Sequence, residues 1–168
     1  MDMISKILIK IQNSDGCDVF PAQGQPKLAS KVIIPEDMRL FYELCGGVKL
    51  FSNKEYHWRI LAPNEIALAE KSILDESEII PELGNLFLIA DDGNGDYLAI
   101  NLDRKSNGYV VDAFHETFGV IGDTPVIAFS FTELLESLYE NSGEYPFWLS
   151  DKSNQYKDWF EINQITKG

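Results

Sequence analysis

The chain has 168 residues, of which 45% are hydrophobic, and its 27 Asp and Glu residues outnumber 14 Lys and Arg residues to give a formal net charge of −13. A chain of this length and composition can bury a continuous core without disulfide bonds or a structural metal. So acidic a surface repels phosphate backbones and anionic lipid headgroups, which argues against nucleic acid and membrane as direct partners. It favours a basic protein partner, although acidity that only keeps a protein soluble is the alternative.

Cysteine usage and the N-terminus indicate a cytoplasmic protein. Cys17 and Cys45 form neither a Cys-x-x-Cys pair nor a metal-ligand run. Two scattered cysteines are typical of a reducing compartment, with one disulfide as the alternative. The N-terminus carries acidic Asp2 and an amphipathic pattern, unlike the basic and then apolar start of a signal peptide. No segment approaches the ~18 apolar residues that a membrane-spanning helix needs.

The N-terminal part is predicted to hold two helices separated by a loop. Residues 3–13 place apolar side chains at helical spacing, whereas residues 17–31, with their Pro and Gly residues, are expected to form a loop. The second helix begins near Pro35, which suits a first helical position, and ends at Gly46. The expected buried faces of the two helices are Ile4, Ile7, Leu8 and Ile11, and Met38, Phe41, Tyr42 and Cys45.

Two strands and a third helix are expected next. The strands are predicted at residues 48–51 and 58–61, and the helix at residues 64–74. The helix is expected to bury Ile66, Ala69 and Ile73.

The middle of the chain is predicted to form a β-meander. The strands are expected at residues 86–90, 97–102, 109–113 and 126–128, with a weaker strand around Val120 between Gly119 and Gly122. In the second of these, apolar residues at every other position predict a strand with one buried face. The turns between the first three strands are too short for βαβ crossovers, so neighbouring strands are expected to be antiparallel.

The C-terminal part is predicted to begin with a strong helix. Ser130 and Glu133 form a capping box, and the helix buries a stripe that runs from Phe131 to Tyr139. Residues 141–168 are expected to pack as an irregular, partly helical tail. Trp58 is expected in the core, while Trp148 and Trp159 could serve either the core or an interface.

These elements predict an α+β fold, with a central, mostly antiparallel sheet of about five to six strands flanked by helices from the N- and C-terminal parts. We expect one domain over residues 1–168. It would begin with an N-terminal helix and loop at 1–29 and end with a C-terminal extension at 142–168.

The most suggestive local motif is the acidic turn from Asp91 to Asp96. Counted from Asp92, it begins like a calcium-binding loop, with oxygen ligands at the first, third and fifth places. The likeness then fails, because Tyr97 stands where the loop needs glycine and Asp103 stands where it needs glutamate. Asn-Gly and Asp-Gly between apolar strands are typical of hairpins. We therefore favour a solvated turn over a calcium site.

No pattern in the chain predicts catalysis. His57 and His115 lie in distant segments, and neither has the sequence context of a base that activates a serine or cysteine nucleophile. His115-Glu116 begins like a zinc-protease motif, but no second histidine follows. Paired carboxylates are the remaining enzymatic alternative because Asp and Glu are abundant. We expect no catalytic residues, no metal site and no cofactor.

A series of short motifs, each weak alone, resembles the SUKH superfamily, which is also known through the yeast cell-wall (glucan) synthesis regulators. The motifs are Ile34-Pro35-Glu36-Asp37, Gly46-Gly47, Pro63-Asn64-Glu65-Ile66, Asp92 to Leu102, Tyr109 to Glu116 and Ser130 to Leu135. The resemblance spans about residues 30–141. It implies an α+β fold without established catalytic residues. It also implies a role, because many bacterial members look like immunity proteins that bind and neutralise a cognate toxin.

The leading hypothesis is therefore an immunity protein that binds a basic toxin, of which nucleases are a common class. The expected partner-binding residues are Asp91, Asp92, Asp96, Asp112 and Glu116. Two alternatives stay open: a regulatory scaffold in cell-wall or polysaccharide synthesis, and a calcium- or small-ligand-binding domain. The sequence does not indicate an oligomeric state.

Overall fold

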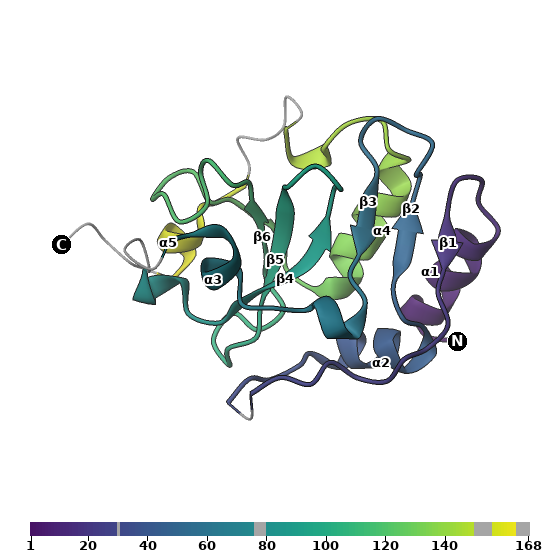
Figure 1. Ribbon diagram of the computed structural model, residues 1–168, viewed down its shortest axis with the longest axis horizontal. Helices are drawn as coiled ribbons and strands as arrows, with labels where there is room; N and C mark the ends of the chain where they lie inside the picture. Colours follow the sequence, from purple (N-terminus) through teal and green to yellow (C-terminus); the bar gives the residue numbers. More distant parts are fainter. Residues whose placement is uncertain (30, 76–79, 150–155, 164–168) are drawn as a thin grey trace.

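The computed structural model describes residues 1–29, 31–75, 80–149 and 156–163. Within these ranges the chain forms a seven-stranded sheet whose strands follow one another in chain order, each antiparallel to its neighbour (Figure 1). The strands are β1 (Asp18–Val19), β2 (Val48–Leu50), β3 (Trp58–Ile60), β4 (Leu86–Asp91), β5 (Tyr97–Asn101), β6 (Val110–Ala113) and β7 (Val126–Ala128). The predicted α+β class is confirmed.

The sheet has more strands than the five to six predicted, because β1 lies inside the expected loop. Only two of its residues pair with β2, Asp18 opposite Lys49 and Val19 opposite Val48. So short a segment carries no alternating pattern that a sequence-based prediction could use.

The strand predicted around Val120 is wrong. This residue lies in consecutive turns, in which its N–H donates to Thr117 O and its own carbonyl accepts from Asp123 N. Gly119 and Gly122 have φ angles of +87° and +94°, in the left-handed region, so they bend the chain rather than extend it. Turn geometry therefore uses the backbone groups that a strand would need for pairing.

The helices α1, α2 and α4 pack against one another. In the view of Figure 1, α4 lies behind the sheet and α3 lies in front of it. The packed helices are α1 (Met3–Gln12), α2 (Glu36–Leu44) and α4 (Phe131–Asn141), and the shorter ones are α3 (Ala69–Ile73) and α5 (Trp159–Ile162). α3 contacts β4. No helix in the described ranges has the length and apolar composition to cross a membrane.

The helix predicted at 64–74 is shorter than expected. A 3-10 turn at Pro63–Glu65 comes first, and α3 starts only at Ala69. Between them the backbone is recruited by β4, because Leu68 forms a bridge with Phe87 and Leu88 N donates to Ala67 O. Ile66 and Ala69 are buried as predicted, and Ile73 is partly buried.

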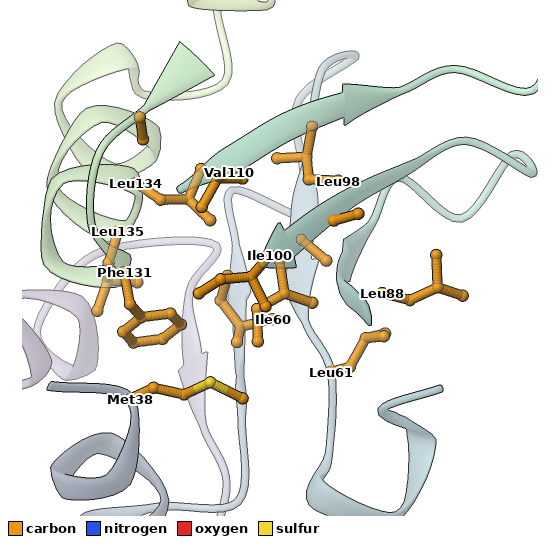
Figure 2. Close-up of a cluster of buried hydrophobic side chains, with 14 of the residues drawn as sticks. Met38, Ile60, Leu61, Leu88, Leu98, Ile100, Val110, Phe131, Leu134 and Leu135 are labelled. Atoms are coloured by element: carbon orange, nitrogen blue, oxygen red, sulfur yellow. The ribbon is translucent and has the colours of Figure 1, made fainter. Parts of the chain in front are cut away.

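The core fills the space between the sheet and the helices α2 and α4. Figure 2 shows Met38 and Phe131 approaching the side chains of Ile60 and Ile100 from the helix side. The other predicted helix stripes are buried as well, except that Tyr139 is only partly buried. β5 was expected to bury one face, yet every residue from Leu98 to Asn101 is buried, because the far face of the sheet is also covered.

The tail beyond α4 also contributes to the core. Trp148 and Trp159 are 4% and 3% exposed, so the open question of their role is answered in favour of burial, as predicted for Trp58. Their ring N–H groups donate to Asp112 Oδ2 and to Glu82 O. Aromatic side chains with satisfied ring N–H groups can be buried without cost to hydrogen bonding.

Candidate functional site

The five carboxylates predicted to bind a partner lie on neighbouring segments near one end of the central strands. Asp91 is the last residue of β4 and stands opposite Tyr97, the first residue of β5. Asp92 and Asp96 lie at the two ends of the turn between these strands. Asp112 is on β6 and stands opposite Leu98 of β5. Glu116 follows in the turn after β6. The structure thus places all five residues on β4, on β6 and in the turns that follow these two strands.

Asp92 is the residue that shapes the turn. Its Oδ1 accepts hydrogen bonds from Asn94 N at 2.8 Å and Asp96 N at 3.1 Å. Gly93 and Gly95 have φ angles of +78° and +97°, which residues with a side chain rarely adopt. In the described residues no group of three or more His, Cys, Asp or Glu side chains is arranged to hold a metal ion. The carboxylate therefore caps a hairpin turn.

Asp91 is paired with Arg59, a residue 32 positions away that the sequence did not single out. The Arg59 guanidinium donates to Asp91 Oδ2 at 2.7 Å and to Asp91 Oδ1 at 3.3 Å. It also donates to both carboxylate oxygens of Glu65, at 2.7 and 2.9 Å. These hydrogen bonds from Arg59 lower the pKa of Glu65. One arginine thus fixes two carboxylates in place.

Asp96 is paired with His115 beyond the end of β6. Asp96 Oδ1 lies 2.7 Å from His115 Nδ1 and also accepts the His115 backbone N–H at 3.2 Å. The hydrogen bond to Asp96 raises the pKa of His115. Glu116 extends into solvent with 70% of its side chain exposed, 3.8 Å from His115 Nε2. Glu116 is therefore exposed, whereas Asp91, Asp92, Asp96 and Asp112 are only partly exposed.

Asp112 differs from the others because its carboxylate is held under the tail. It accepts from Trp148 Nε1 at 2.9 Å and from Phe114 N at 3.2 Å. Burial raises the pKa of Asp112 to about 6, and the nearby charge of Asp96 acts in the same direction. Asp112 is half-buried and fixes the tail to β6, so it supports the surface more than it presents a charge on it.

A hollow of about 200 Å³ lies beside this group, against β2, β3 and the end of β4. Its lining consists of Lys49, Leu50, Ser52, His57, Trp58, Arg59, Asp91 and Gly93. A second hollow, of about 360 Å³, lies elsewhere, next to Asn101 and Trp159. Sequence reasoning assigned no role to Lys49 or Arg59, and no local motif marks them.

The cysteines do not form a reactive site. Cys17 and Cys45 are both free and buried, so the alternative of a disulfide between them is excluded. Burial raises the pKa of the Cys45 thiol to about 11 and also raises the pKa of Cys17. A catalytic thiol needs a lowered pKa because the thiolate is the nucleophile. Neither thiol has that environment.

Comparison with known proteins identifies the family. The family model SMI1 / KNR4 (SUKH-1) matches residues 27–137, close to the 30–141 expected from the motifs. The chain is 36% identical over 148 residues to a protein named immunity protein YokJ from Bacillus subtilis (strain 168), which covers 88% of this chain and 90% of that protein. No solved structure matches the chain significantly. The chain belongs to the SMI1 / KNR4 family (SUKH-1).

Proposed function

We propose that this chain is an immunity protein that neutralises a cognate toxin by binding it directly, without catalysis, in the cytoplasm. The observation that carries the proposal is the 36% identity, over nearly the full length of both chains, to a protein named as an immunity protein. The net charge of −13 supports a basic partner, because opposite charge accelerates association and favours the correct pairing. A nuclease fits this description, since it must itself bind phosphates.

We place the toxin-binding surface at the acidic end formed by Asp91, Asp92, Asp96, Asp112 and Glu116. Its support is geometric: the carboxylates of four of them are held by Arg59, by backbone N–H groups, by His115 or by Trp148. A surface whose charges are fixed before binding loses little conformational entropy when the partner arrives. Glu116 and the turn around Asp92 then supply the accessible contacts.

The test uses the polypeptide encoded by the gene beside the one for this chain. That polypeptide is expressed in bacteria with and without this chain, and growth and the dissociation constant of the purified pair are measured. We expect the chain to restore growth and to bind in a one-to-one complex. If protection of the toxin's target were complete at far less than one equivalent, the chain would be turning over a substrate and the proposal would be wrong.

Two variants locate the surface. Glu116→Lys reverses an exposed charge, and Asp92→Asn removes a charge while its amide oxygen can still accept the turn hydrogen bonds. Each is expected to weaken toxin binding about tenfold, which is typical of a contact that matters at an interface. Glu43→Lys on α2 is the control, because this exposed residue lies on a different element. If Glu116→Lys and Glu43→Lys weakened toxin binding equally, the loss would reflect only the net charge of the chain, and the proposed surface would be excluded.

A further inference from the structure

Two of the residues that line the hollow, Lys49 and Arg59, lie on the face of β2 and β3 opposite to that of Ile60, which belongs to the core in Figure 2. Along β2 and β3 buried and accessible side chains alternate: Lys49 is exposed between two buried residues, and Arg59 is half-buried between two others. Lys49 and Arg59 are directly opposite one another in the register, and Asp91 follows on β4. Charged side chains on three adjacent strands therefore form its floor.

Hydrogen-bond acceptors lie on two sides of the hollow. Asp91 contributes a carboxylate, which is 18% exposed. His57 Nδ1 lies 3.0 Å from Lys54 O, and a carbonyl oxygen only accepts, so the proton of the neutral ring is on Nδ1. His57 Nε2 is then an acceptor. It faces the β4–β5 turn, since a Cβ built on Gly93 would lie 3.5 Å from it.

The lining also contains two cationic side chains, Arg59 and Lys49, and each of them already has a partner of its own. The Arg59 guanidinium is already bound to Asp91 and Glu65. The Lys49 ammonium lies 5.8 Å from the centre of the Phe20 ring, which follows β1 on the side of β2 away from β3. Their aliphatic stems are left as apolar walls. The lining itself holds one carboxylate, Asp91, but Glu65 is bound to Arg59 and Asp92 stands between Asp91 and Gly93. Counted with these neighbours, three carboxylates surround the two cations, within a chain of net charge −13.

We propose that this hollow receives a single arginine side chain of the partner protein, as the anchor of the interface. Its volume of about 200 Å³ is below the range typical of small-molecule sites, roughly 300–1,000 Å³. Arginine is among the residues that most often anchor interfaces by filling a pocket. Its planar guanidinium donates in several fixed directions, which suits a carboxylate on one side and a ring nitrogen on the other. The identification of the partner as a toxin rests on the function proposed above.

The first experiment needs no partner. The 15N-labelled chain is titrated with N-acetylarginine methylamide, and with N-acetylcitrulline methylamide as the uncharged analogue of the same shape. We expect saturable shifts of the backbone amides of residues 49, 57–59 and 91–93 with the arginine compound, at concentrations of roughly 1–50 mM. The citrulline compound should give none. Shifts spread over all acidic segments would mean unspecific attraction and would overturn the proposal.

Two variants and a control test the acceptors. His57→Phe keeps a ring but removes both ring nitrogens, Nε2 and the Nδ1 that contacts Lys54 O, and Asp91→Asn removes the carboxylate charge. Each is expected to raise the half-saturation concentration at least fivefold. Glu43→Gln on α2 changes the net charge of the chain by the same amount as Asp91→Asn and should leave it unchanged. Because Asp91→Asn also releases Arg59, His57→Phe decides the case: an unaltered titration with this variant would disprove the arginine subsite.

The second experiment separates this inference from the proposed function. The dissociation constant of the neighbouring gene's polypeptide is measured for the wild-type chain, for His57→Phe and for Glu43→Gln. About a tenfold loss of affinity with His57→Phe alone is expected, a typical cost for an anchor contact. Tight binding by the wild type with no loss in His57→Phe would exclude the subsite and leave the function intact. Localised binding of the arginine compound without binding of that polypeptide would instead exclude the function.

Discussion

Trp148 and Asp112 are joined by a hydrogen bond of 2.9 Å from the indole Nε1 to the carboxylate Oδ2, which ties the segment after α4 to β6. Trp148 also packs against Trp58 on β3, with ring centres 5.6 Å apart, so the same side chain bridges two strands. Asp112 is close to Asp96, whose charge acts on it. Trp148, by contrast, belongs to the part of the chain beyond residues 27–137, which the family model matches. The tail and the acidic end are therefore parts of one structure, and their stabilities should be coupled.

Replacement of Trp148 should show this coupling. Trp148→Ala removes a buried ring and is expected to lower the free energy of unfolding by about 3–5 kcal/mol, as for other buried aromatic side chains. Trp148→Phe should cost less, but it removes a hydrogen bond that lowers the pKa of Asp112. We expect the pKa of Asp112 to rise above about 6 in this variant. Urea denaturation measures the first effect and NMR titration of the carboxyl carbon the second; an unchanged pKa would contradict the hydrogen bond.

The stability of the chain should increase as the pH falls from 8 to 5. The folded pKa of Asp112, about 6, exceeds its ordinary value of 3.8, so the folded state takes up a proton first and gains stability as the pH falls through 6. The raised pKa of His115 acts in the same sense, because its contribution is present below its ordinary value of 6.5 and is lost as the pH rises through the folded pKa.

Asp112→Asn should remove most of this pH dependence. The expected contribution of Asp112 in the wild type is roughly 1–3 kcal/mol, since one unit of pKa corresponds to about 1.4 kcal/mol. Chemical denaturation at half-unit pH steps measures it for both proteins. The control is Asp123→Asn, at an acidic residue of the turn before β7, which should preserve the wild-type slope. A variant Asp112→Asn that kept the full slope would show that another group titrates.

Arg59→Met should destabilise the fold because it leaves Asp91 and Glu65 without their shared cation. We expect a loss of about 1 kcal/mol, because the three side chains are only partly exposed. The pKa of Glu65, which Arg59 lowers, should return toward its ordinary value of 4.5. Since a lowered pKa gives stability that is lost in acid, the difference between the proteins should shrink as the pH falls through the folded pKa of Glu65.

A matched control for this variant is Lys54→Met, which breaks the exposed ion pair with Glu144. The two side chains are 47% and 64% exposed and their charged atoms are 3.7 Å apart. Exposed pairs contribute little, so the free energy of unfolding should change by about 0.5 kcal/mol or less. Thermal and urea denaturation of both variants test the contrast. Equal effects would mean that the Arg59 pair is no stronger than an ordinary surface contact.

Truncation after residue 141 should abolish cooperative folding. The missing part includes Trp148, Trp159 and Phe160, all of them buried. It also removes the main-chain hydrogen bond from Val126 N to Lys157 O along β7. We expect the full chain to unfold in one transition and the truncated chain to lose its sharp thermal transition. A truncated chain that still unfolded sharply would mean that the tail is a separate unit and would contradict the prediction of one domain over residues 1–168.

Local chemistry explains which elements could be predicted. α4 was predicted because its signals lie within a few residues: Ser130 Oγ accepts from Glu133 N at 3.0 Å, and an apolar stripe follows. The Glu133 carboxylate accepts a hydrogen bond from Phe129 N rather than from Ser130 N, a small departure from the predicted box. The turn at Asp92 was predicted for the same reason, because its hydrogen bonds reach only two to four residues ahead.

Contacts between distant segments decided the rest. The helix predicted at 64–74 is shortened because Leu68 forms a β-bridge with Phe87. The two residues of β1 form a strand because they pair with β2. The sequence indicated acidic residues at one end of the sheet and a family of binding proteins. The partners Arg59 for Asp91 and Trp148 for Asp112 lie 32 and 36 residues away, and no local pattern encodes such a pairing. Short-range hydrogen bonds and periodic burial depend on residues that are close in sequence, so the sequence alone can predict them. The burial, the hydrogen-bond partner and the pKa of a carboxylate depend instead on the distant residues that the fold brings next to it.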